Sequence, residues 1–410
     1  MAWLKNYKSS IILLSSVALG AFIGCNYPTM ANFLKPFGEI FLNLMFVILV
    51  PLVFFSILSA MTKSDDLNRM KKITTSSFIV FFCMIVIVCV MGYLGALILN
   101  PLHGVDVSGI MNNLPVIEAK AMTFSEAIVR IFSAPDFSVI FSKSNLLPLI
   151  VFAFLLGSAI NGVGEKGKPV VILIHSINEV LMKLINILMI FAPIGLGSYF
   201  AYTISVLGST VLYGFATATL LYLILTVIYW AILSPLYAFI AKGPRGVSLY
   251  WKNIIPPSLM AIATSSSAAC IPINLATAKK MEIQDDVAET VMPLGANIHK
   301  DGSALSALVK ITFLFALTGQ SLSGIENALA IIGVAILAST LTGAIPGGGV
   351  AGELMICTMF GFPQEMFALI VILATIVDIP ATLLNSNGQL TAGMLVDRLV
   401  GRSKDAPSEI

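Results

Sequence analysis

"IIPPSLMAIATSSSAACIPINLATA", residues 254–278, is an apolar segment that is interrupted at its centre by the hydroxyl side chains of Thr264–Ser267 and carries prolines near both ends. A second apolar segment, residues 326–362, is interrupted in the same way around "STLTGAIPGGGVAG" (339–352). A helix cannot run unbroken through Pro346–Gly349, and backbone groups left unpaired in lipid cost several kcal/mol each. We therefore predict that both segments are re-entrant helical hairpins whose tips are buried in protein or line a cavity.

Each predicted hairpin is followed by a helix that is itself interrupted. Residues 285–316 contain "ANIHKDGSA" (296–304), and residues 365–400 contain "DIPATLLNSNGQLT" (378–391). The order of hairpin, broken helix, hairpin and broken helix is an internal repeat of architecture. Paired broken segments of this kind indicate a binding site near the midplane of a secondary transporter.

The composition is that of a polytopic membrane protein. Of the 410 residues, 58% are hydrophobic and only 11% are charged, whereas about 25% are charged in soluble domains. Several apolar runs reach the about 20 residues that cross a bilayer as a helix. The sequence thus predicts an all-α membrane protein with about eight transmembrane helices plus the two re-entrant hairpins. The polar stretch 100–145 is expected to be a loop with short helical pieces, and the helices before residue 242 are expected near 10–30, 37–62, 73–99, 146–163, 170–205 and 210–241.

The placement of the basic residues indicates the orientation of the chain. Lysines precede the first span, further Lys and Arg residues follow the second, and the C-terminal "DRLVGRSKD" (397–405) is basic. By the positive-inside rule, both termini of this multi-pass protein are expected on the cytoplasmic side of the cytoplasmic membrane. The five cysteines lie in or beside apolar stretches without a CxxC pair, so neither a disulfide nor a metal site is expected of them, and no cofactor is expected.

The hairpin tips and helix interruptions contain four motifs in a fixed order: "SSSAACIP" (265–272), "PLGANIHKDGSAL" (293–305), "GAIPGGGVAG" (343–352) and "DIPATLLNSNGQLT" (378–391). Together they resemble the dicarboxylate/amino-acid:cation symporter family, the glutamate-transporter homologues. The resemblance implies a membrane-embedded homotrimer that carries a small amino acid by an elevator mechanism. It also implies a scaffold in residues 1–72 and most of 100–241, and a transport domain in residues 73–99 and 254–400.

The same resemblance implies how the substrate is held. Asp378 matches the aspartate that binds the substrate ammonium, and Asn385 matches the residue that binds the α-carboxylate. Thr382 and Ser303 are expected to face the ligand, although each hydroxyl could instead satisfy its own helix backbone. Exposed backbone amides at the two tips favour negative charge, and they are expected around Ser266, Ser267, Ile345, Gly347 and Gly349.

Two departures from the family pattern concern the substrate. Carriers of acidic amino acids need a guanidinium for the side-chain carboxylate, but this sequence has Ala381 and Ser265 at the two places that supply it. Details of the motifs resemble the family's serine/threonine carriers. The hypothesis is therefore a small neutral amino acid such as serine, threonine or alanine, and the alternative is a Na⁺-coupled symporter of dicarboxylates or acidic amino acids.

Further departures concern the coupling ion. Asp301 matches a sodium-ligating aspartate, and Gly295, Asn297 and Asn385 could add oxygens, but His299, Lys300 and Gln389 replace residues of the family pattern. An ammonium about 4 Å from a sodium ion repels it by roughly 4 kcal/mol at an effective dielectric constant of 20. Na⁺ binding at Asp301 is therefore disfavoured.

Three kinds of coupling remain open: H⁺, Na⁺ through what is left of the site, and ion-independent transport. The sharper hypothesis is that Lys300 is a tethered cation that pairs with Asp301, or that Lys300 or His299 carries a coupling proton. The alternative is that Lys300 extends to water and only excludes sodium. Glu353 could carry a proton, but a position in the water-filled mouth of the second hairpin is the favoured interpretation.

Functions of other classes fit the sequence less well. Re-entrant hairpins also build the filters of ion and anion channels, but two dissimilar tips and an Asp378–Asn385 pair suit a zwitterion better. No HExxH or GxSxG motif occurs in the sequence, so neither an enzyme nor any catalytic residue is predicted. Lipid and a small amino acid are the expected partners, and nucleic acid is not.

Overall fold

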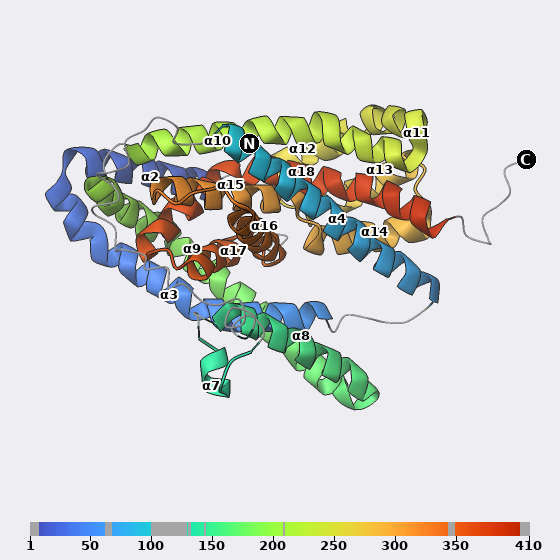
Figure 1. Cartoon of the computed structure of the whole chain (residues 1–410), viewed down its shortest axis with the longest axis horizontal. Coiled ribbons are helices and arrows are strands. Elements are labelled where there is room, and N and C mark those ends of the chain that lie inside the picture. The colour runs from blue at the N-terminus through green and yellow to red at the C-terminus, as the bar shows by residue number, and fades with distance from the viewer. Residues whose placement is uncertain are drawn as a thin grey trace, which may run out of the picture.

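The computed structural model describes residues 8–61, 68–99, 129, 133–142, 145–207, 210–342 and 349–401. Every regular element in these ranges is a helix, so the all-α prediction is confirmed for them. Figure 1 shows long helices that run roughly along the longest axis of the molecule. Most of the polar stretch 100–145 lies outside the described residues, and within it the structure describes the short helix α7, Phe137–Ile140.

Three N-terminal helices pack together: α2 (Lys8–Asn26), α3 (Pro28–Met61) and α9 (Lys168–Leu207). Helix α8 (Leu146–Val163), linked to α9 by the 3₁₀ turn Gly164–Gly167, packs against α3. Small residues bring these helices close, because a Cβ on Gly20 would lie 2.3 Å from the carbonyl oxygen of Gly197. These helices lie at the left and lower side of Figure 1.

Helix α15 (Asp301–Leu317) is the centre of the second group of helices, and nearly all of its residues are buried. A helix that is apolar on every side is expected to be enclosed by others. Four helices surround it: α4 (Asn68–Ile98), α10 (Thr210–Ile228), α16 (Ile325–Thr340) and α18 (Gln364–Val400). A π-helical turn at Tyr229–Leu233 joins α10 to α11 (Ser234–Asn253), which packs against α18.

The predicted interruption of the first apolar segment is confirmed. Helix α12 ends at Thr264, α13 spans Ile271–Lys280, and the two helices contact each other and α18. Ser265 ends α12 in the left-handed region at φ 46°. In the second apolar segment α16 contacts α17 (Val350–Phe360), while the tip at 343–348, with the predicted site residues Ile345 and Gly347, lies outside the described residues. Re-entry of either pair from one side of the membrane stays a prediction.

One of the two predicted helix interruptions is present. Helix α14 (Asp285–Ile298) and α15 are separated by His299 and Lys300, and His299 is extended at φ −83° and ψ 105°. The break predicted in residues 365–400 is wrong, because α18 runs from Gln364 to Val400 as one helix that contains Pro380. A proline removes one backbone hydrogen bond and bends a helix, and helices packed around it compensate for that loss inside a membrane.

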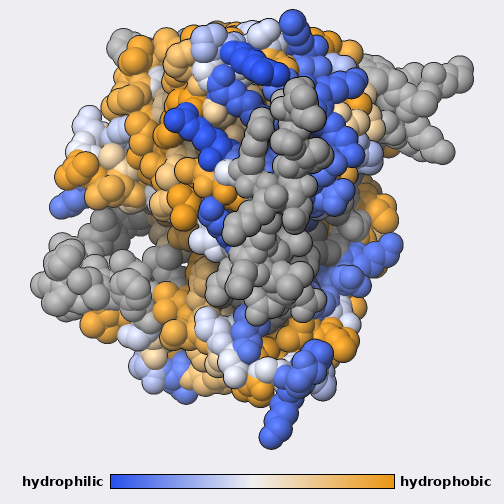
Figure 2. Space-filling model, turned by 90° about the vertical axis from the view of Figure 1, so that its right-hand side faces the viewer, coloured by the Kyte–Doolittle hydropathy of each residue, from blue (hydrophilic) through white to orange (hydrophobic). Residues whose placement is uncertain are grey.

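The described helices are long and apolar enough for several membrane spans. Five of them meet the length and composition of a span, namely Pro28–Ser59, Lys72–Ile98, Pro148–Ile185, Leu212–Asn253 and Met366–Val400. Figure 2 shows one end of the molecule, where apolar side chains gather mainly toward the left of the view and hydrophilic side chains lie across its middle and right. The total of about eight spans stays a prediction.

Candidate functional site

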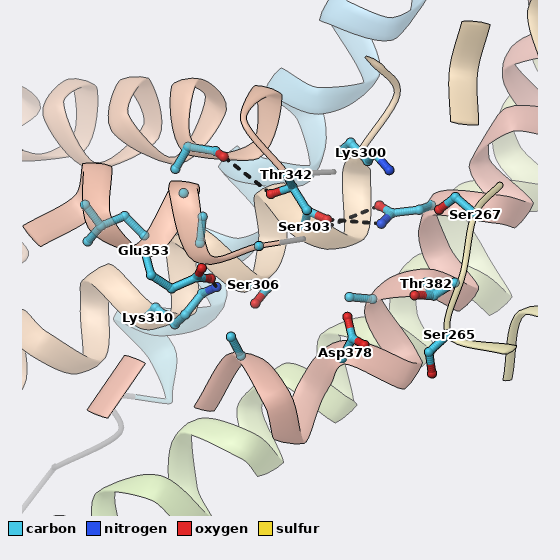
Figure 3. Close-up of a pocket in the computed structure, with 18 residues that line it drawn as sticks. Ser265, Ser267, Lys300, Ser303, Ser306, Lys310, Thr342, Glu353, Asp378 and Thr382 are labelled. Atoms are coloured by element: carbon cyan, nitrogen blue, oxygen red, sulfur yellow. Dashed lines mark hydrogen bonds and ion pairs between the residues drawn. The ribbon is translucent and has the colours of Figure 1, made fainter. Parts of the chain in front are cut away.

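A cavity lies where α15, α17 and α18 meet the turn between α12 and α13. Seven of the residues predicted for the site line it, namely Ser267, Lys300, Ser303, Gly349, Asp378, Thr382 and Asn385. In Figure 3, Ser303 of α15 lies on one side of the cavity, and Asp378 and Thr382 of α18 lie on the other. The cavity therefore brings together seven of the residues predicted for the site, and the role of each of them stays a prediction.

Asn385 closes the helix interruption at the start of α15. Its side-chain oxygen accepts hydrogen bonds from the backbone N–H groups of Gly302 at 2.9 Å and Ser303 at 3.2 Å. Its Nδ2 donates to the Ser303 hydroxyl at 3.0 Å. The first amides of a helix have no partner within the helix, so Asn385 of α18 satisfies two of them and fixes Ser303 at the cavity wall.

Gly302 allows α15 and α18 to approach closely. A Cβ at this position would lie 2.2 Å from the carbonyl oxygen of Ala381. We expect Gly302→Ala to lower the free energy of unfolding by about 1–3 kcal/mol, as overpacking does, and to reduce uptake because the site widens. Gly333→Ala on α16 is the matched control, since a Cβ there meets nothing within 4 Å. Thermal unfolding in detergent and uptake would check both, and equal values for the two variants would contradict the expectation.

Asp378 and Thr382 lie one turn apart on α18, and both line the cavity, as does Ser265 at the end of α12 (Figure 3). The Ser265 hydroxyl is buried and has no hydrogen-bond partner among the described residues. Ser266 does not line the cavity, and its hydroxyl instead accepts from the backbone N–H of Ala269 at 3.3 Å within the turn. The part of the cavity formed by α18 and the α12–α13 turn therefore carries one carboxylate and several hydroxyl groups.

A buried ion pair between Lys310 and Glu353 forms another part of the cavity wall. Lys310 on α15 is 4% exposed and Glu353 in the first turn of α17 is 3% exposed. The favoured interpretation that Glu353 lies in a water-filled mouth is thus wrong, because Lys310 holds it inside the protein. Sequence reasoning missed Lys310, although an ionisable residue in the apolar run "ALVKITF" (307–313) is a functional candidate by default.

Asp301 lies in a second, fully buried polar cluster. Its Oδ2 is 3.3 Å from Nε2 of His299 and accepts a hydrogen bond from the Tyr229 hydroxyl. The His299 ring stacks on Phe81 with a centroid distance of 4.8 Å. The structure therefore places His299 and Tyr229 beside the carboxylate that was predicted to pair with Lys300, while Lys300 lines the cavity together with Asp378. Pairing of Lys300 with Asp301 stays a prediction.

The side chains of Gln389 and Asn297 have partners other than Asp301, and a contribution of the backbone carbonyls of Gly295 and Asn297 to an ion site stays a prediction. Gln389 packs against Gly295, where a Cβ would lie 2.9 Å from Cγ of Gln389, and its Oε1 accepts from Nδ2 of Asn274 at 3.0 Å. The side chain of Asn297 is exposed and donates to the carbonyl of Pro293 at 3.0 Å. Asn274, which sequence reasoning missed, therefore connects the α12–α13 pair to α18 through its hydrogen bond with Gln389.

The described residues form an all-helical protein with several possible membrane spans, and its cavity is lined by ionisable and hydroxyl side chains. The sequence matches the Sodium:dicarboxylate symporter family over residues 10–399, and the chain belongs to this family of membrane transporters.

Similar proteins include the proton/glutamate-aspartate symporter of Bacillus subtilis, which is 28% identical over 393 residues and is aligned over 94% of this chain and 93% of its own. The proton/sodium-glutamate symport protein of Bacillus caldotenax is 25% identical over 95% of this chain and 93% of its own. The C4-dicarboxylate transport protein of Agrobacterium fabrum is 27% identical over 84% of this chain and 76% of its own.

Proposed function

We propose that this symporter-family protein carries a small zwitterionic amino acid, such as serine, threonine or alanine, across the cytoplasmic membrane. The observation that supports this proposal is the charge balance of the cavity. Its four ionisable side chains are two lysines, Lys300 and Lys310, and two acids, Glu353 and Asp378. Charge complementarity favours a solute without net charge in such a site, with its ammonium at Asp378 and its carboxylate toward Ser303 and the serines of the α12–α13 turn.

A second candidate is an acidic amino acid, and Lys310 is the observation that favours it. The cavity has no arginine at the two places expected from the family, but the Lys310 ammonium lies in its wall. An ammonium binds a carboxylate as a point charge, without the two-pronged geometry of a guanidinium. The names of the similar proteins, which refer to glutamate, aspartate and C4-dicarboxylates, agree with this candidate.

Uptake into proteoliposomes separates these candidates. The purified full chain would be reconstituted and offered radiolabelled serine, alanine, aspartate and a C4-dicarboxylate, each at low micromolar concentration. Saturable uptake of serine or alanine supports the first candidate. Saturable uptake of aspartate alone supports the second, and a current without saturable uptake of any of them would indicate a channel.

We propose proton coupling rather than sodium coupling, because His299 and Tyr229 already contact the carboxylate that matches the sodium-ligating aspartate. A ring nitrogen of an imidazole can take up and release a proton. The homotrimer is a part of the proposal that rests on the family, and the cytoplasmic position of both termini rests on the placement of the basic residues.

Replacing His299 by Asn and Lys300 by Met together is expected to make uptake dependent on sodium. The change returns an amide oxygen next to Asp301 and removes an ammonium that repels a cation by a few kcal/mol. Uptake measured with sodium and with choline as the only cation checks this. The same double variant with Asp301→Asn added is the control and should lose the sodium effect. Uptake that ignores sodium in the double variant would contradict the expected role of these two side chains.

The proposed division into a scaffold and a moving domain also concerns α10. Tyr222 of α10 donates its hydroxyl proton to the carbonyl of Gly302 at 2.9 Å. Tyr229, in the π-helical turn that follows α10, donates to Asp301. Helix α10 also packs against α18. These contacts favour placing α10 with the transport domain instead of the scaffold, so that the division falls between α9 and α10.

A further inference from the structure

The Lys310–Glu353 pair joins two elements of the cavity wall through side chains that are almost completely buried. Lys310 comes from the third turn of α15, and Glu353 comes from the first turn of α17. Figure 3 shows the two side chains meeting at the same wall, with Asp378 across the cavity. Their positions place a fixed cation and a fixed anion beside the space in which the proposed amino acid would bind.

Stability alone is a weak explanation for this pair. Taking two charges out of water costs several kcal/mol for each ion, and buried pairs replaced by apolar residues often leave a protein equally stable or more stable. The neighbouring residues of α15 and α17 are apolar or small and equally buried, so an apolar pair would fit the surroundings. A role toward the solute is the stronger explanation, because both side chains line the cavity.

Lys310 is also placed for the far end of an amino acid. It follows Ser303 by seven residues, two turns along the same face, which corresponds to about 10.5 Å along the helix axis. Side chains of a helix lean toward its N-terminus, so the Lys310 stem leans back toward Ser303. An amino acid held at Asp378 and Ser303 would therefore direct its own side chain toward Lys310.

Glu353 is paired with the Lys310 ammonium, which a substrate carboxylate would need as its own partner. We propose that Lys310 binds the side-chain carboxylate of an acidic amino acid. Glu353 must take up a proton before Lys310 can bind this substrate carboxylate. The proton binds to a carboxylate oxygen of Glu353 while the cavity is open to the side of the membrane from which the substrate enters. It leaves Glu353 together with the substrate when the cavity is open to the other side of the membrane. An acidic amino acid is then carried with one proton more than a neutral one. This inference rests on the proposed function as an amino-acid carrier.

The charges around Glu353 agree with this exchange. Within the described residues, Lys310 of α15 and Asp378 of α18 face the same cavity as Glu353, as does Lys300, and the thiol of Cys357 lies one turn away on α17. The other helices that pack on α17 add little: α16 carries only Glu326 in its distant first turn, α8 carries no ionisable residue, and Lys35 and Glu39 of α3 pair with each other at 3.4 Å.

A net count of charge explains why one proton is needed. The four ionisable side chains of the cavity sum to zero when all are charged. An acidic amino acid brings one negative charge and would face both Glu353 and Asp378. A proton on Glu353 returns the occupied cavity to zero and leaves Lys310 paired with the substrate, whereas a neutral amino acid needs no such proton.

The test compares the uptake of aspartate with that of serine in proteoliposomes at pH 5.5 and 7.5. For the wild type, we expect the aspartate-to-serine uptake ratio to rise at least fivefold at the lower pH. For Glu353→Gln, which mimics the protonated acid, the ratio at pH 7.5 should rise at least tenfold above that of the wild type and lose its dependence on pH. The matched control is the double variant Glu353→Gln with Lys310→Met, in which the ratio should fall at least tenfold below that of Glu353→Gln.

A pair that only held α15 and α17 together would change the uptake of both amino acids equally and leave the ratio unchanged. An unchanged ratio in Glu353→Gln therefore overturns the inference, while the proposed function stands as long as the wild type carries either amino acid. If the wild type carries neither, the proposed function fails and this inference with it. If the variants do not fold, the protons carried by the wild type with each amino acid, counted with a pH indicator inside the liposomes, decide: equal counts overturn the inference.

Discussion

Replacing Asp378 by asparagine should reduce amino-acid uptake at least about thirtyfold, because the change removes the carboxylate that receives the substrate ammonium. Removing one partner of a desolvated, hydrogen-bonded charge pair costs about 2–5 kcal/mol, and each 1.4 kcal/mol is a tenfold change in affinity. The change also leaves Lys300 and Lys310 with Glu353 as the one remaining acid of the cavity, so the site becomes positive and repels an ammonium.

The measurement is the initial rate of uptake at a substrate concentration below half-saturation, with equal amounts of reconstituted protein. Asp397→Asn is the matched control on the same helix, because Asp397 pairs with Lys242 at 3.2 Å and does not line the cavity. Its uptake should stay within threefold of the wild type. A similar rate in Asp378→Asn would mean that the ammonium binds elsewhere.

Replacing Lys310 by methionine should lower the free energy of unfolding by about 3–5 kcal/mol, because it leaves the carboxylate of Glu353 buried without its partner. Met is close to lysine in length and apolar, so little of the loss comes from packing. Adding Glu353→Gln should recover most of the lost stability, since an amide carries no charge into the apolar wall.

Unfolding in detergent, followed by heating or by a denaturant series, checks both variants. The exposed pair Lys279–Asp285, at 3.3 Å, provides the control, because exposed pairs contribute about 0–1 kcal/mol. Lys279→Met should therefore change stability little. Equal effects of Lys279→Met and Lys310→Met would show that burial of the Lys310–Glu353 pair has no energetic consequence.

The breaks in the first apolar segment and at His299–Lys300 could be predicted from the sequence because their causes are local. Hydroxyl side chains, prolines and charged residues within an apolar run act on the backbone where they stand. The same local reasoning failed for α18. Pro380 and the polar residues after it resemble those of a broken helix, but neighbours packed along α18 keep it continuous.

The part of the site that the sequence did not reveal depends on contacts between distant residues. Lys310 and Glu353 are 43 residues apart, and Tyr229 and Asp301 are 72 apart, so no spacing within a motif relates them. Lys300 and Asp301 are adjacent, and adjacency suggested an ion pair. The turn at the helix break places Lys300 at the cavity and His299 beside the carboxylate of Asp301, and the sequence did not predict this contact of His299.

The hydrogen bonds of Tyr222 and Tyr229 have a mechanical consequence. They attach the end of α10 to the start of α15 at two places. Tyr222 lies in α10 itself, and Tyr229 lies in the π-helical turn that follows it. Under the proposed elevator mechanism, α10 has to move together with the cavity, and so do the apolar side chains that α10 exposes, such as Leu220 and Val227. The boundary between the scaffold and the moving domain would then lie between α9 and α10. The thickness of the surrounding bilayer would help to determine how far the cavity moves.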